Sequence, residues 1–119
     1  MSRNGYRDLQ VWQKAVDLVV AIYKATKSFP SDERFGLTSQ LRRAAVSVAA
    51  NIAEGHGRTT RGEYGHCLSI SRGSLKEVET YCEVSLRLQY VTPTDYRALL
   101  DAADEISRML TSLKRHLGR

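Results

Sequence analysis

Proline, which interrupts helices, is scarce in this chain of 119 residues. It occurs only at Pro30 and Pro93. Because an interior proline removes a backbone hydrogen bond and clashes with the preceding turn, its scarcity leaves long stretches free to form helix. Long apolar runs are also missing, and none approaches the roughly 20 residues that a membrane-spanning helix needs. We therefore expect a helical protein that does not have a membrane as its partner.

Cysteine is equally scarce, and its two copies exclude a disulfide framework. Cys67 and Cys82 fall in one predicted helix, where their separation corresponds to about 22 Å along the axis. A disulfide needs Cα atoms within about 7 Å of each other. Two isolated thiols suit a reducing compartment, and the N-terminal segment MSRNGYRDLQ lacks the apolar run of a signal peptide. We therefore expect a cytoplasmic protein.

Acidic residues are outnumbered by basic ones, 13 to 18, so the net charge is +5 at neutral pH. Thirteen of the basic residues are arginine, whose planar guanidinium favours bidentate contacts with phosphate or carboxylate groups. A positive balance is compatible with nucleic acid or with acidic partners, and equally with an ordinary solvated surface. Charge alone therefore leaves the class of partner open.

Apolar residues recur every three or four positions through most of the chain, which is the period of a helix. This pattern predicts four helices and no strand. The four helices span residues 9–27, 37–54, 61–89 and 93–117. Asp8 is the expected cap of the first helix, and Gly55 is expected to end the second in left-handed geometry. Short connections favour antiparallel neighbours, so we predict an all-α fold, an antiparallel up-down-up-down four-helix bundle formed by residues 1–119 as one domain.

The first predicted helix carries a second apolar stripe beside the one that faces the core. Trp12, Val16, Val19 and Tyr23 form this second stripe. An apolar face of that width indicates burial on two sides, against the other helices and against a neighbouring subunit. Trp12 is therefore a candidate interface residue in a homo-oligomer.

The second predicted helix carries a polar stripe next to its apolar one. Its members are Gln40, Arg43, Ser47, Asn51 and Glu54, spaced three or four residues apart on one face. Such a stripe is typical of a satisfied polar network between helices or subunits. The alternative is a groove that holds a ligand or partner, with Arg43 and Asn51 as its contact residues.

A glycine-rich and arginine-rich connection follows this helix, from Gly55 to Arg61. Arg58 and Arg61 add positive charge next to the start of the third helix, where unpaired backbone N–H groups favour an anion. The segment is not a phosphate-binding P-loop, because no Gly-Lys-Ser/Thr follows and no strand precedes it. An anion or nucleotide site and a flexible turn between helices both remain open.

Several segments together resemble a known family. They are VWQKA at residues 11–15, ERFGL at 33–37, QLRRA at 40–44 and NIAEG at 51–55. Their order and spacing resemble the bacterial four-helix-bundle family first noticed as proteins encoded in intervening sequences of large-subunit ribosomal RNA genes. The resemblance implies a bundle that assembles as a ring-like homopentamer. It also implies a distant similarity to the accessory variability protein of retroelements, which binds nucleic acid and a reverse transcriptase.

No pattern in the chain indicates an enzyme. Glu63 and His66 have the spacing of half a di-iron site, but such a bundle site needs two motifs of this kind and two further inward glutamates. Cys67 follows His66 directly, and adjacent residues of a helix point about 100° apart. We therefore expect no catalytic residue, no metal and no cofactor.

The sequence predicts a non-enzymatic, oligomeric scaffold that binds RNA or DNA through a basic surface. The candidate binding residues are Arg42, Arg43, Arg58 and Arg61. Residues 34–61 carry five arginines against the single acid Glu54, and a ring would repeat this charge in every subunit. The alternatives are a protein–protein adaptor and an anion or nucleotide site in the Gly55–Arg61 connection.

Overall fold

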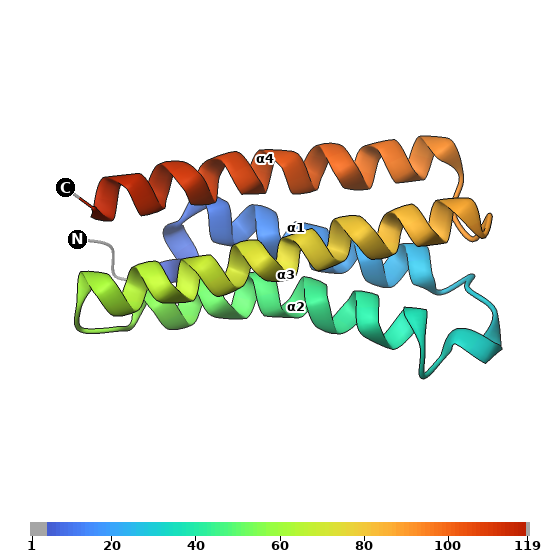
Figure 1. The fold of residues 1–119 in the computed structure, drawn as a ribbon, viewed down its shortest axis with the longest axis horizontal. Coiled ribbons are helices and arrows are strands. Elements are labelled where there is room, and N and C mark those ends of the chain that lie inside the picture. Colours follow the sequence, from blue (N-terminus) through green and yellow to red (C-terminus); the bar gives the residue numbers. More distant parts are fainter. Residues whose placement is uncertain (1–4, 119) are drawn as a thin grey trace.

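Four long helices make up the computed structural model, which describes residues 5–118 (Figure 1). The helices are α1 (Gln10–Thr26), α2 (Leu37–His56), α3 (Arg61–Arg87) and α4 (Pro93–Leu117). Two short 3-10 helices, η1 (Gly5–Asp8) and η2 (Ser31–Glu33), precede α1 and α2. The described part of the chain contains no strand, so the predicted all-α class is confirmed.

Successive helices run in opposite directions along a body of 44 × 22 × 22 Å. Each helix packs on the next, and α1 also packs on α4, which closes the bundle. The α2–α3 connection lies at the same end as the start of α1 and the last turn of α4 (Figure 1). The α1–α2 and α3–α4 connections lie at the opposite end. This arrangement is the predicted four-helix bundle.

The core follows the apolar spacing of the sequence. On α4, Leu99, Ala103, Ile106 and Leu110 are buried at intervals of four, three and four residues. Leu18, Ile22, Leu41, Ile52, Leu68 and Leu75 are among the fully buried side chains that meet them. Removing this apolar surface from water is the main force that holds the four helices together.

The starts of α4 and α1 differ in their capping. Thr92 accepts a hydrogen bond from the backbone N–H of Asp95 at 3.1 Å, and Pro93 occupies the first helical position, as its fixed φ favours. On α1 the capping position belongs to Leu9, which makes no side-chain cap. The predicted Asp8 cap is therefore wrong, because Asp8 is the last residue of η1 and does not occupy the capping position of α1.

Gly55 does not end α2, which continues to His56. Only Gly5 has a positive φ among the described glycines, so the predicted left-handed role of Gly55 is wrong. Gly55 is buried where α2 meets α3. A Cβ atom there would lie 2.9 Å from the Cβ of Cys67 and 3.0 Å from Cδ1 of Tyr64. The missing side chain is what allows the two helices to approach so closely.

Glu83 of α3 accepts one hydrogen bond from α4 and one from its own helix near the α3–α4 connection. The hydroxyl of Tyr96 donates to Oε1 of Glu83 at 2.6 Å, and Nε of Arg87 donates to Oε2 at 3.0 Å. These two bonds lower the pKa of Glu83, the bond from Tyr96 being the larger cause. The same bond raises the pKa of Tyr96, because the neighbouring carboxylate disfavours the phenolate.

Both cysteines of α3 are free and buried. Burial, with a smaller effect of the Glu79 charge, raises the pKa of Cys82 to about 12. The thiol of Cys82 is therefore protonated at neutral pH, and a protonated thiol is a poor nucleophile.

Candidate functional site

The polar stripe of α2 faces α3, where part of it forms a network. The hydroxyls of Ser47 and Ser74 are 2.8 Å apart and share a hydrogen bond. Nδ2 of Asn51 donates to the backbone carbonyl of Ser47 at 2.9 Å and to its hydroxyl at 3.1 Å. Deeper in the same interface, Ser71 donates to the carbonyl of Val48 at 2.8 Å. The side chains of Ser47 and Asn51 therefore find hydrogen-bond partners in each other and in α3, within one subunit.

Gln40 and Arg43 lie on the exposed part of the stripe. Both line a shallow cavity of about 260 Å³ between α2 and α3, which Glu77 and Tyr81 of α3 also line. The cavity therefore holds one guanidinium and one carboxylate. This balanced charge offers no strong preference for an anion.

Arg42 points away from that cavity and links α2 to α1. Its Nε donates to Oγ1 of Thr26 at 2.8 Å, and that hydroxyl donates to the carbonyl of Ile22 at 2.7 Å. Its guanidinium carbon lies 4.5 Å from the centre of the Tyr23 ring, within the range of a cation–π contact. Arg42 therefore holds the C-terminal end of α1, where helix carbonyls lack partners within the helix.

Arg58 pairs with the last member of the stripe. Nη2 of Arg58 lies 2.5 Å from Oε1 of Glu54, one turn earlier in the chain. This hydrogen bond is the main reason that the pKa of Arg58 is raised above its ordinary value. Both side chains are exposed, so Arg58 remains accessible to a partner that displaces Glu54.

Arg61 lines a groove between the start of α3 and the end of α4. This α3–α4 groove has a volume of about 530 Å³. It is lined by Arg61, Gly62, Gly65, His66 and Ser69 of α3, by Lys114 of α4, and by residues 117–118. Nζ of Lys114 donates a hydrogen bond to the hydroxyl of Ser69. Sequence reasoning missed the groove, because Ser69 and Lys114 meet only once the bundle has closed.

The four candidate arginines thus occupy two separate places. Arg42 and Arg43 lie in the first half of α2, on different faces. Arg58 and Arg61 lie at the end of the bundle that holds the α2–α3 connection. The helical stretch from Arg43 to the last residue of α2, His56, alone corresponds to about 20 Å, and Arg58 lies beyond that end. One subunit therefore does not bring the four guanidinium groups together.

The second apolar stripe of α1 is only partly covered. Trp12 is half-buried and contacts the ring of Tyr6 edge-on, with centroids 5.1 Å apart. Farther along α1, Tyr23 of the stripe is 41% exposed, and Val20 beside the stripe is 46% exposed. The bundle itself therefore leaves part of this face in water.

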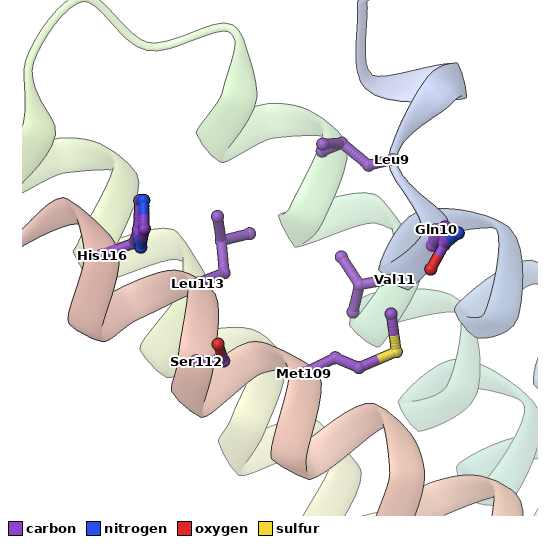
Figure 2. Close-up of a pocket in the computed structure, with 7 residues that line it drawn as sticks. All are labelled: Leu9, Gln10, Val11, Met109, Ser112, Leu113 and His116. Carbon is purple, nitrogen blue, oxygen red and sulfur yellow. The ribbon is translucent and has the colours of Figure 1, made fainter.

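An apolar cavity of about 330 Å³ lies between the start of α1 and the last turns of α4. Figure 2 shows Leu9 and Val11 on one side of it, and Met109 and Leu113 on the other. Gln10, Ser112 and His116 are its polar lining residues.

Within residues 5–118, no three His, Cys, Asp or Glu side chains are grouped so that they could hold a metal ion. None of the described helices has the length and apolar character required to cross a membrane.

Comparison with known proteins identifies close structural relatives but no activity. A family model described as 23S rRNA-intervening sequence protein matches residues 7–112. A crystal structure of a protein of unknown function from the S23 ribosomal protein family of Bacteroides thetaiotaomicron VPI-5482 is similar at 26% identity and a TM-score of 0.79. That similarity covers 87% of this chain and 97% of the other. No curated protein matches the chain.

Proposed function

The chain belongs to the family of 23S rRNA-intervening sequence proteins, and on that basis we propose that it is a non-enzymatic cytoplasmic module that self-assembles and binds RNA. The binding surface in this proposal is the end of the bundle that holds the α2–α3 connection. We call it the basic end and define it by Arg58, Arg61, Lys114 and Arg115.

The convergence of two basic segments carries the proposal. Residues 55–62 and 111–118 contain these four cationic residues and no acidic residue. The fold brings the segments together, since Arg61 and Lys114 line one groove. Glu54 and Glu63 flank the first segment and weaken its field. The remaining positive potential suits the phosphate backbone of RNA, which supplies most of the affinity in sequence-independent binding.

Self-assembly would strengthen this field. The partly exposed apolar face around Val20 and Tyr23 is a suitable surface for a neighbouring subunit. The ring-like homopentamer expected from the family resemblance would repeat the basic end once in every subunit. Repeated basic ends add their potentials at short range and raise the encounter rate with a polyanion.

Fluorescence anisotropy with a labelled single-stranded RNA tests the binding. We expect an affinity that falls steeply with salt, and a weaker salt dependence in the double variant Arg58→Gln/Arg61→Gln. Loss of two phosphate contacts should reduce the slope of log K against log salt by about 1.4. The control is Lys27→Gln/Arg97→Gln, which removes the same charge from exposed positions at the opposite end. Absence of binding by the unmodified chain at low salt would contradict the proposal.

Two further measurements separate assembly from partner choice. Light scattering should give a multiple of the 13.4 kDa subunit mass, and Val20→Lys should reduce it. A stable monomer at all concentrations would exclude the ring. If RNA does not bind, a protein retained in a nuclease-treated pull-down would favour the adaptor alternative, for which Phe35, 87% exposed, is the natural contact.

A further inference from the structure

We propose that the α3–α4 groove is a phosphate-binding subsite, with Arg61, His66 and Lys114 as its anion-contacting residues. The inference rests on the proposed function and assigns part of the basic end a defined ligand chemistry. The ligand is a phosphate group, carried either by an RNA backbone or by a free phosphate compound.

The donors in the groove match this chemistry. Arg61, His66 and Lys114 all line it, so residues that carry a guanidinium, an imidazole and an ammonium group border one space. None of the described residues that line it is acidic. Arginine binds phosphate oxygens in bidentate fashion, and lysine acts as a compact point charge. The shallow cavity beside Arg43 lacks this property, since Glu77 also lines it.

Lys114 is already held in place before any ligand arrives. One of its three N–H donors is taken by the hydroxyl of Ser69, which leaves two for an anion. The restraint also reduces the side-chain entropy that a lysine loses when it binds. A Cβ at Gly65 would lie 4.0 Å from Cε of Lys114, which is an ordinary van der Waals distance, so the lysine stem lies alongside α3 at this position.

The groove also has room for a ligand. Its volume of about 530 Å³ lies within the range of ordinary small-molecule sites, about 300–1,000 Å³. A Cβ at Gly62 would meet no atom within 4 Å, so the groove is open beside the first turn of α3. Thr60 accepts the N–H of Glu63 at 3.1 Å. The N–H groups of Arg61 and Gly62, in the same first turn, lack acceptors within the helix and add to the positive potential there.

Nuclear magnetic resonance of backbone amides tests the site directly, with inorganic phosphate and a single-stranded RNA as separate probes. We expect both probes to shift the amide signals of Gly62, Gly65 and Gly118, which line the groove. The signal of Gly73 is the internal control, because this glycine is exposed on α3 two turns beyond Gly65. Shifts of equal size at Gly73 would overturn the assignment of the groove.

Two variants test the charge of the groove. Lys114→Gln should weaken the binding of both probes about tenfold, as expected for the loss of a hydrogen bond to a charged group. The control Arg97→Gln removes the same charge near the other end of α4 and should change affinity less than twofold. Gly62→Glu should abolish binding by placing a carboxylate in the groove, whereas Gly62→Gln should not. Both Gly62 variants should fold, since the position is open.

The outcomes distinguish this inference from the proposed function. Groove signals that move with phosphate while RNA fails to bind would support the subsite, as a site for free phosphate compounds, and refute RNA binding. RNA binding with unmoved groove signals, and with Lys114→Gln equal to the unmodified chain, would refute the subsite and leave RNA binding intact. If neither probe binds, both proposals are wrong.

Discussion

Replacing Gly55 by alanine puts a methyl group where α2 and α3 have no room for one. Its Cβ would lie 2.9 Å from the Cβ of Cys67 and 3.0 Å from Cδ1 of Tyr64, whereas ordinary contacts begin at 3.4 Å. The Cβ of Cys67 is fixed to its helix, so the clash can be relieved only by moving α2 and α3 apart. Overpacking of this kind costs about 1–3 kcal/mol.

A gain in helix propensity works against this cost. Alanine in a helix interior is more stable than glycine by about 0.8–1.0 kcal/mol. We therefore expect Gly55→Ala to lower the free energy of unfolding by about 1 kcal/mol in total. Gly73 provides the matched control, because it lies in the interior of α3 and a Cβ there would meet no atom within 4 Å. Gly73→Ala should raise the free energy of unfolding by about 0.5–1 kcal/mol.

Urea unfolding followed by circular dichroism measures both changes at one fixed protein concentration, since assembly makes stability depend on concentration. The two variants should move the midpoint in opposite directions, by about 0.5 M each. A more stable Gly55→Ala would refute the close approach of α2 and α3. A less stable Gly73→Ala would show that this exposed face is covered in the assembled protein.

Further measurements test the core, the thiol, an acid-sensitive bond and a cap. Leu110→Ala should lower the free energy of unfolding by about 2–5 kcal/mol in urea titrations, because Leu110 is fully buried in the core. Cys82, whose pKa is raised to about 12, should resist alkylation at pH 8 until the chain is unfolded; rapid labelling of the native protein would contradict its burial. The pKa of Glu83 is lowered in the folded state, so its stabilising effect is present above the ordinary value of 4.5 and is lost as the pH falls through the folded value. Tyr96→Phe removes the main cause of that shift, and acid titrations of stability should therefore be less steep in this variant. Thr92→Ala should lower the thermal midpoint, because loss of the cap reduces the free energy of unfolding by about 1 kcal/mol; Thr94→Ala is the control.

The helices were predictable because their pattern is local. The spacing on α4 from Leu99 to Leu110 puts the apolar residues on one face of the helix. That face must be buried against other helices, whichever side chains those helices contribute. The cap at Thr92 was equally predictable, since Pro93 and Asp95 follow it within three residues. Both kinds of information lie within a few neighbouring residues.

The roles of particular side chains were less predictable, because their partners are distant in the chain. A glycine near a helix end suits a left-handed turn or a close helix contact, and only Cys67 and Tyr64 decide the matter for Gly55. Arg42 is identical in type to Arg43, yet Thr26 and Tyr23 engage it while Arg43 stays exposed. The α3–α4 groove depends on Ser69 and Lys114, which no local pattern connects.

The close packing of α2 on α3 bears on the order in which the chain folds. Only residues 57–60 separate these two helices, so bringing them together costs little loop-closure entropy. Their contacts, with Gly55 next to the connection, are therefore well placed to form the folding nucleus. The pairing of α1 with α4 closes the longest loop of the bundle. It has the largest loop-closure entropy cost and is therefore expected to form last.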